Sequence, residues 1–349
     1  MSLMLRACVC YFLLAACTAF VVKAADAKPA KTQPAAPAVE PPAPKEFPRA
    51  EALSSTPALA DEMHQGGGKL VLLDARNRAA FESGHLPGAF NLESDALQDP
   101  QRPPYFMAAP EILKKLCAEA GIHAASRVVI YDEDDARLAA RVWFTLHAHG
   151  HDHAAILDGG VGKWRAEGRP LVEGPGTAPL TLPSPQGGEG GVRGRGSFEP
   201  LPVPRSVCTF AELPQFRTRV HTLGSLPPTT LLDARSLPEY TGEDARAKAG
   251  GHIPGAANIE WSALLAPPVA SPGKDGKAGA RVWRSPPEIH AILRMAGVES
   301  GQKIAVYDQA GGRSAHLYLT LWLMGFPSVF NYVAGWREYG NREDVEIEK

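Results

Sequence analysis

The sequence is poor in cysteine, and this shortage excludes two classes of protein. Only five cysteines occur among its 349 residues. Cys8, Cys10 and Cys17 lie in the apolar N-terminal segment, so only Cys117 and Cys208 remain for the globular part. Two cysteines this far apart do not make a disulfide framework, and they lack the spacing of a metal-ligand set. We therefore expect two structural thiols, no metal site and no other cofactor.

The chain also lacks an excess of charge of either sign. Its 36 Lys and Arg residues nearly balance 38 Asp and Glu residues, and the formal net charge is −2. A nucleic-acid-binding domain usually carries a basic patch and a high pI, whereas this chain has a pI near 6.6. Arg193 and Arg195 stand in a glycine run that we interpret as a solvated insertion. We therefore expect no nucleic-acid partner.

Long apolar runs are missing except at the N-terminus. Residues 1–22 combine Arg6 with an apolar run, which is typical of an export signal and short for a membrane span. The sequence Leu-Ala-Ala-Cys ending at Cys17 also fits the cleavage pattern of bacterial lipoproteins, with ordinary cleavage near 24–27 as the alternative. Both routes predict an exported protein, either periplasmic or anchored through a lipidated Cys17 to a membrane and facing the periplasm. The Ala/Pro-rich residues 23–49 predict an extended tether.

What the chain does contain is a long internal repeat. The sequences LLDAR at 72–76 and GHLPGA at 84–89 return as LLDAR at 231–235 and GHIPGA at 251–256. A repeat of this length represents two copies of a whole domain. We predict domains at 50–172 and 206–349, joined by a Gly/Pro-rich linker at 173–205. Alternating strands and helices predict an α/β fold in each, with a mainly parallel sheet flanked by helices on both faces.

One stretch of the second copy has the pattern of a site. The apolar run 304–307 predicts a buried strand, residues 308–313 a short loop, and residues 314–324 a helix that ends before Gly325. In this arrangement several backbone N–H groups point to one spot at the positive end of a helix. The loop is therefore predicted to favour an anion or a thiolate, and we expect any chemistry of the chain to take place there.

Together these motifs resemble those of the two-domain rhodanese sulfurtransferases, the thiosulfate and 3-mercaptopyruvate sulfurtransferases. The resemblance covers roughly 50–172 and 206–349, and the PEYTGE sequence at 238–243 followed by 250–256 is similar to the bacterial thiosulfate type. It implies an inert first domain and a second domain whose loop begins with a cysteine that carries sulfur as a persulfide. Carried over to this chain, the position of that cysteine holds Asp308. The rest of the loop keeps the family's length and character as an anion cradle: Gln309, Ala310, Gly311, Gly312 and Arg313.

An aspartate at this position argues against sulfur transfer. A carboxylate neither attacks sulfur at a useful rate nor carries it. We expect Asp308 to accept the loop N–H groups itself and to repel thiosulfate. Asp132 begins the corresponding acidic loop of the first copy. Phosphoryl transfer to Asp308 would need further carboxylates for Mg²⁺, and none cluster near it in sequence.

The remaining polar residues of the motifs have structural explanations. We predict that Arg313 pairs with Asp308 or another acid, and that Asp233 and Arg235 form a structural pair, because Asp-Ala-Arg occurs in both copies. For the same reason His85 and His252 are predicted to stabilise their turns. The alternating histidines after 146 favour a solvated helix end over a metal tract: His147, His149, His151 and His153.

Two functional hypotheses remain open. The first is a binding or scaffolding protein that uses the rhodanese fold without persulfide catalysis. The second is an active sulfurtransferase, of the thiosulfate:cyanide or 3-mercaptopyruvate type, that uses another thiol. Position 308 favours the first. The sequence identifies no partner, and Asp308 disfavours a small sulfur-containing anion as a ligand.

Overall fold

The computed structural model describes residues 42–65, 69–98, 107–176, 198–202, 205–216, 229–268 and 279–349. The proposed lipidation residue Cys17, the export signal, residues 23–41 of the tether and residues 177–197 of the linker lie outside these ranges. Residues 41–349 form one compact unit. No helix among the described residues has the length and apolar character needed to cross a bilayer.

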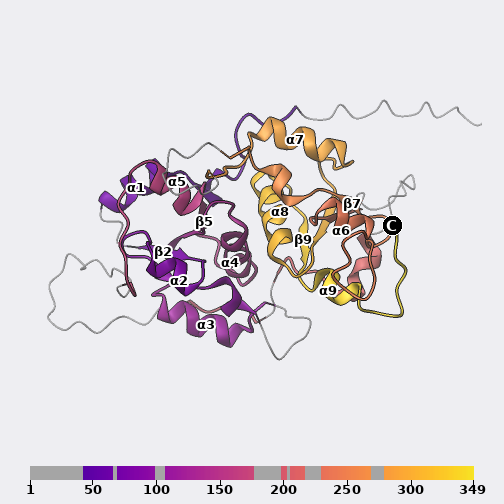
Figure 1. Cartoon of the computed structure of the whole chain (residues 1–349), viewed down its shortest axis with the longest axis horizontal. Helices are drawn as coiled ribbons and strands as arrows, with labels where there is room; N and C mark the ends of the chain where they lie inside the picture. The colour runs from indigo at the N-terminus through magenta and orange to yellow at the C-terminus, as the bar shows by residue number, and fades with distance from the viewer. Residues whose placement is uncertain are drawn as a thin grey trace, which may run out of the picture. The chain divides into compact units, whose positions relative to one another are not determined.

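The first domain is a five-stranded parallel sheet covered by helices (Figure 1). The strand order is β1-β5-β4-β2-β3, which places β4 at the centre. The strands are β1 (Leu53–Ser54), β2 (Leu70–Asp74), β3 (Phe90–Asn91), β4 (Arg127–Tyr131) and β5 (Ala154–Leu157). The helices are α1 (Thr56–His64), α2 (Arg78–Glu82), α3 (Pro110–Glu119), α4 (Arg137–Ala148) and α5 (Gly160–Ala166), with 3₁₀ turns η1 (Ala50–Ala52) and η2 (Ser94–Leu97).

The second domain repeats this arrangement with the order β7-β6-β8-β9, again parallel. Its strands are β6 (Thr229–Asp233), β7 (Ala257–Asn258), β8 (Lys303–Tyr307) and β9 (Val329–Tyr332). Its helices are α6 (Leu237–Thr241), α7 (Pro286–Met295), α8 (Gly312–Leu323) and α9 (Gly335–Tyr339), with 3₁₀ turns η3 (Phe210–Phe216) and η4 (Trp261–Leu264). A single parallel bridge from Val207 to Asn331 takes the place that β1 has in the first domain. The predicted tandem α/β fold with parallel sheets is confirmed.

Local sequence explains where these elements begin and end. The central strands β4 and β8 are buried apart from their first residues, as expected for apolar runs in a parallel sheet covered on both faces. Helices α6 and α7 each start with a capping box, Ser236 with Glu239 and Ser285 with Glu288. A proline follows each cap within the first turn, where its missing N–H costs nothing.

The two domains meet through α4 and α8, which are the helices that follow the central strands. These helices lie side by side in Figure 1. Tyr318 of α8 packs edge-on against Phe144 of α4 at 4.7 Å between ring centroids, and its hydroxyl lies 3.2 Å from Nε2 of His147. The largest apolar cluster includes buried residues of both domains, so the interface is continuous with the two cores.

Two segments expected to be free of the domains contact them instead. Arg49, at the end of the predicted tether, donates its backbone N–H to the carbonyl of Leu323, and its guanidinium lies 3.6 Å from the ring centre of Trp322. Near the end of the predicted linker, Leu201 donates its backbone N–H to the carbonyl of His149 at 2.9 Å, and its own carbonyl lies 3.0 Å from Nδ1 of the His149 ring. Apolar side chains in both segments, such as the buried Phe198, explain this packing.

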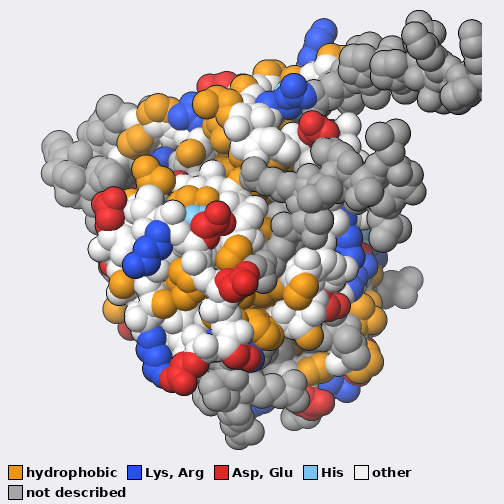
Figure 2. Space-filling view, turned by 90° about the vertical axis from the view of Figure 1, so that its right-hand side faces the viewer, with side chains coloured by type: hydrophobic (Ala, Val, Ile, Leu, Met, Phe, Trp, Pro, Cys, Tyr) orange, Lys and Arg blue, Asp and Glu red, His pale blue; other side chains and the backbone are white. Residues whose placement is uncertain are grey.

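Figure 2 shows acidic and basic side chains interspersed over one face of the molecule, with no field of one sign. This distribution agrees with the near balance of charges in the sequence.

Candidate functional site

The loop that joins β8 to α8 forms the candidate site. Gly311 has φ +93°, a conformation that residues with a Cβ rarely adopt, and a Cβ there would lie 2.9 Å from Cγ1 of Val333. The backbone carbonyl of Asp308 accepts a hydrogen bond from the N–H of Trp336 at 2.7 Å, which joins the start of the loop to α9. Glycine at 311 is therefore required by both conformation and space.

The carboxylate of Asp308 occupies the cradle of its own loop. Its Oδ1 accepts the N–H of Ala310 at 2.9 Å and that of Gly311, while its Oδ2 accepts the N–H of Arg313 at 2.7 Å. The hydroxyl of Ser314 lies 3.4 Å from Oδ1. Asp308 is only 2% exposed. The predicted capping is thus observed, and three of the loop amides that could bind an external anion, those of Ala310, Gly311 and Arg313, are already bonded.

Arg313 is paired, but its main partner is an acid that sequence reasoning did not place at the site. Nη2 of Arg313 donates to Oε1 of Glu239 at 2.8 Å, and Nη1 bonds the other oxygen. Nε of Arg313 lies farther from Asp308, at 3.7 Å from Oδ2. Burial by itself would raise the pKa of Glu239, but the bonds and charge of Arg313, with Ser236, lower that pKa to about 2. In the sequence, Glu239 belongs to the PEYTGE motif and to a capping box with Ser236, but neither signal places it beside Arg313.

Gln309 turns its side chain away from the cradle. Its Nε2 donates to the backbone carbonyl of Arg246 at 3.0 Å, and its Oε1 is buried without a partner among the described residues. The backbone carbonyl of Gln309 accepts the N–H of Arg337. The side chain therefore joins the loop to the segment after α6 and leaves the cradle to Asp308.

The corresponding loop of the first domain is also capped by its aspartate. Oδ1 of Asp132 accepts the N–H of Ala136 at 3.0 Å, and Oδ2 accepts those of Leu138 and Ala139 at 2.8 and 3.2 Å. Burial and the charge of Asp135 raise the pKa of Asp132 to about 7, although the three amide bonds oppose this. Each aspartate therefore accepts three backbone N–H groups that follow it in the chain.

Neither cysteine of the two domains is placed to act as a nucleophile. Cys117 lies in α3 and Cys208 lies before η3, and both are free and buried. Burial raises the pKa of each thiol to about 12, so the thiolate is scarce at neutral pH. The loop 308–313 contains no cysteine.

The Asp-Ala-Arg and Gly-His motifs have the structural roles predicted for them. Asp233 and Arg235 form a buried pair at 2.6 Å, and Arg235 also donates to the carbonyl of Gly251. Nδ1 of His252 lies 3.0 Å from the carbonyl of Tyr240, and Nδ1 of His85 lies 2.9 Å from that of Phe81.

The prediction of a solvated helix end at the alternating histidines is wrong. His147, His149 and His151 are buried, because α8 covers His147 and residues 198–202 return over the other two. Nδ1 of His147 lies 2.9 Å from Asp152. Within the described ranges, no group of three or more His, Cys, Asp or Glu side chains is arranged to hold a metal ion.

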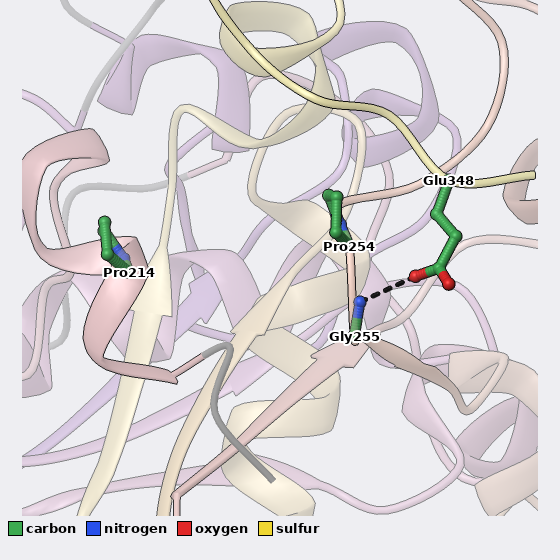
Figure 3. A pocket seen from close by; sticks show the side chains of 4 residues that line it. All are labelled: Pro214, Pro254, Gly255 and Glu348. Atoms are coloured by element: carbon green, nitrogen blue, oxygen red, sulfur yellow. Dashed lines mark hydrogen bonds between the residues drawn. The ribbon is translucent and has the colours of Figure 1, made fainter. Parts of the chain in front are cut away.

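An open hollow of about 470 Å³ lies elsewhere in the second domain (Figure 3). Its lining residues are Pro214, Pro254, Gly255 and Glu348, and Oε2 of Glu348 accepts the N–H of Gly255 at 2.8 Å. None of the residues 308–313 lines this hollow.

Comparison with known proteins agrees with this architecture. A family model described as a rhodanese-like domain matches residues 56–167 and 216–342. The thiosulfate sulfurtransferase of Azotobacter vinelandii is 32% identical over 283 residues, which cover 80% of this chain and 91% of that protein. The thiosulfate sulfurtransferase of Pseudomonas aeruginosa is 30% identical, with 81% and 92% covered.

A solved structure shows the same fold. It is that of an anaerobic ergothioneine biosynthesis enzyme from Chlorobium limicola, crystallised with trimethyl histidine, with a TM-score of 0.67 at 24% identity. The match covers 87% of this chain and 71% of that one. The repeated domain, the capped strand–loop–helix and these matches lead to one assignment: the chain belongs to the rhodanese family and is related to thiosulfate sulfurtransferases.

Proposed function

We propose that this is an exported tandem rhodanese-fold protein that binds or scaffolds without persulfide catalysis. The observation that carries the proposal is the Asp308 carboxylate, which takes the backbone amides of the loop where the family places a cysteine. Persulfide transfer needs a polarisable thiolate, and a carboxylate cannot supply one. A negative charge at the centre of the cradle also disfavours thiosulfate.

The alternative is a sulfurtransferase that works through another thiol. The burial of Cys117 and Cys208, and the pKa of about 12 that burial gives each thiol, argue against this route. A partner's thiol would still have to approach a loop in which Asp308 already bonds three of the amides.

The test compares three proteins in a thiosulfate:cyanide assay, with persulfide measured by mass spectrometry after exposure to thiosulfate. The wild type is expected to show no turnover above a heat-killed control. Asp308→Cys is expected to gain a persulfide and partial activity, because a thiol at this place meets the N–H groups of Ala310, Gly311 and Arg313. Asp132→Cys in the first domain is the matched control and should gain neither.

Two outcomes would contradict the proposal. One is robust wild-type turnover that disappears in Cys208→Ser, which would identify a second thiol as the carrier. The other is wild-type turnover that disappears in Asp308→Ala, which would give the carboxylate itself a role in the reaction.

Export is a separate part of the proposal and rests on residues 1–22 and Cys17. In a bacterial host, the full chain is expected to fractionate outside the cytoplasm and to incorporate labelled palmitate. Cys17→Ser should abolish the label. A chain that stays in the cytoplasm contradicts export, whereas an exported chain without label indicates ordinary cleavage.

A further inference from the structure

His147, near the end of α4, is the centre of a polar contact between the two domains. Its Nδ1 lies 2.9 Å from Oδ1 of Asp152 in the first domain, and its Nε2 lies 3.2 Å from the hydroxyl of Tyr318 in α8 of the second. The imidazole stacks on Trp143 with 4.8 Å between ring centroids, and its centroid lies 4.5 Å from that of Trp322. Both ring nitrogens are thus bonded, one to each domain, in a site enclosed by aromatic rings.

These two contacts are those of a neutral imidazole. The arrangement that satisfies both has the proton on Nδ1, which donates to the carboxylate of Asp152, and leaves Nε2 to accept the hydroxyl hydrogen of Tyr318. A second proton, on Nε2, would turn this acceptor into a donor, so Tyr318 could no longer donate to it. The contact between the domains therefore depends on the charge of His147.

The surroundings of His147 disfavour that second proton. The titratable groups that face it come from four segments: Asp152 after α4, Tyr318 in α8, Arg205 between the domains and Arg49 before the first domain. Burial lowers the pKa of the histidine, the bond and charge of Asp152 oppose this effect, and the charges of Arg205 and Arg49 add to it. Oδ1 of Asp152 also accepts a hydrogen bond from Nη2 of Arg205, so its charge is shared. A protonated imidazole would therefore meet two guanidinium groups in a site where His147 is only 2% exposed.

The chain passes from one domain to the other at the same place. Nε of Arg205 donates to the carbonyl of His147 at 3.1 Å, so Arg205 is held by the first domain. The next residue, Ser206, has φ 61°, which is uncommon for a residue with a Cβ, and its carbonyl accepts the N–H of Asn331 in β9 of the second domain. A hydrogen bond from the side chain of Ser206 to Tyr318 places this residue beside the contact made by His147. Two adjacent residues thus hold different domains, with a strained backbone conformation between them.

We propose that the contact between His147 and Tyr318 is a pH-sensitive switch: the neutral imidazole holds the two domains together, and its protonation lets them separate about Ser206. A histidine exposed to water titrates near 6.5, whereas the pKa of His147 in the closed interface is lowered. The proton is therefore taken up mainly by the separated form. The stabilisation of the closed form is complete above about pH 6.5 and is lost as the pH falls.

Separation of the domains would change the surroundings of the loop after β8. Helix α4 begins at its own capped loop and carries His147 near its other end. At the loop end of the interface, a Cβ built on Gly312 of α8 would lie 4.0 Å from Nη1 of Arg137, so the two helices are close there. A rotation about Ser206 would move the starts of these helices apart and admit water beside the loop. The switch goes beyond the binding function proposed above and does not depend on what the loop binds.

The test measures hydrogen exchange of the full mature chain by mass spectrometry at pH 7.5 and pH 5.5, corrected for the intrinsic pH dependence of exchange. The N–H of Arg281 reports separation of the domains, because it donates to the carbonyl of Asp134 across the interface at 3.1 Å. Peptides of β8, an inner strand of the second sheet, report unfolding of that domain itself. In the wild type, protection at Arg281 is expected to fall about tenfold between the two pH values, as for a histidine that titrates near 6.5 in the separated form and stays neutral in the closed one.

Three variants show whether His147 causes this fall. His147→Gln keeps a donor and an acceptor but cannot gain a proton, so protection at Arg281 should no longer change with pH. His153→Gln, at an exposed histidine in the turn after α4, is the matched control and should keep the tenfold fall. Tyr318→Phe removes the hydrogen bond and keeps the aromatic ring, and it should lower protection at Arg281 about fivefold at pH 7.5.

An equal fall in the wild type and in His147→Gln would overturn the proposal, as would a wild type without any fall. A fall in β8 as large as that at Arg281 would also overturn it, because the whole domain and not the interface would then respond to pH. If His147→Gln does not fold, Tyr318→Phe keeps the test decisive, since unchanged protection at pH 7.5 would mean that this contact does not hold the domains together.

Discussion

The loops after β4 and β8 have different backbone conformations, although the aspartate side chain of each accepts hydrogen bonds from the backbone amides that follow it. Helix α4 begins five residues after Asp132, whereas α8 begins four residues after Asp308. The left-handed residue just before the helix is Ala136 in the first loop, with φ 60°, and Gly311 in the second, with φ 93°. The second loop is thus shorter and relies on glycine, which brings the N–H groups of residues 310, 311 and 313 around one carboxylate.

The surroundings of the two loops differ as well. In the second domain Glu239 and Arg313 form a largely buried pair. The positions that correspond to them in α2 and α4 hold Ala80 and Leu138. Backbone N–H groups of residues 281 and 283, from the second domain, donate to Asp134 and Asp158 beside the first loop. The first loop therefore receives hydrogen bonds from the other domain, and its Glu133 pairs with Arg76 and Arg165 at 2.7 and 3.1 Å. In the second loop the paired residue is a cation, Arg313.

The strongest test of this comparison concerns what the loops share. Gly335 (φ +58°) and Gly160 (φ +57°) approach the carbonyls of Asp308 and Asp132, and an added Cβ would lie 2.3 and 2.6 Å from those oxygens. Gly335→Ala and Gly160→Ala should each lower the free energy of unfolding by about 4 kcal/mol, from backbone strain and the clash together. Urea denaturation followed by circular dichroism measures this.

Gly297→Ala separates the effect of backbone strain from that of the clash with the added Cβ. Gly297 also has a positive φ, of 75°, but nothing lies within 4 Å of its Cβ position. It should cost only about 1 kcal/mol. Equal losses in all three variants would mean that close approach to the aspartate carbonyl is not what the two loops have in common.

The next test concerns the pair of Glu239 with Arg313 in the second domain. Glu239→Gln leaves Arg313 without its bidentate partner in a site where Glu239 is 1% exposed, so about 3 kcal/mol of stability should be lost. Glu82→Gln, which breaks the exposed pair of Arg78 and Glu82 in α2, should cost less than about 0.5 kcal/mol. Denaturation midpoints of the two variants at pH 7 decide this, and equal losses would remove the distinction between the domains.

A smaller effect is expected from His316, whose counterpart in α4 is Arg141. Burial, with the charge of Arg281, lowers the pKa of His316 to about 3. An unfolded histidine titrates near 6.5, so only the unfolded state takes up this proton between pH 6.5 and 3. The stability due to neutral His316 is complete above pH 6.5 and is lost as the pH falls.

His316→Phe should therefore lose about 2 kcal/mol less stability than the wild type between pH 7 and pH 5. Denaturation at the two pH values measures the difference. The exposed His153 serves as the control, since His153→Phe should keep the pH dependence of the wild type. If the stability of His316→Phe depended on pH as strongly as that of the wild type, the burial of His316 would not distinguish α8 from α4.

The fold and the position of the loop could be predicted because their signals are local and occur twice. The LLDAR and Gly-His-x-Pro-Gly motifs mark equivalent strand ends and turns, and the expected strand at 304–307 and helix at 314–324 differ from β8 and α8 by a few end residues. The capping by Asp308 was also predictable, since it involves residues within five positions along the chain.

The contacts between distant segments could not be predicted. Glu239 is 74 residues from Arg313, and a capping box gives no hint of which cation its acid will meet. The histidines after 146 resemble a solvated helix end because their sequence is polar, but Tyr318 and Leu201, far along the chain, cover them. Which side chains are buried at an interface depends on packing that no local pattern encodes.

The attachment of Arg49 has a mechanical consequence. Its N–H reaches the carbonyl of Leu323 at 3.3 Å, and its Nη1 reaches the carbonyls of Trp322 and Phe326 at 3.3 and 3.1 Å, although these partners lie more than 270 residues away in sequence. In a chain anchored at its N-terminus, tension would pass from residue 49 directly into the end of α8, before it reached the first domain. The first helix to bear this tension would thus be α8, which begins at Gly312, one turn from Asp308.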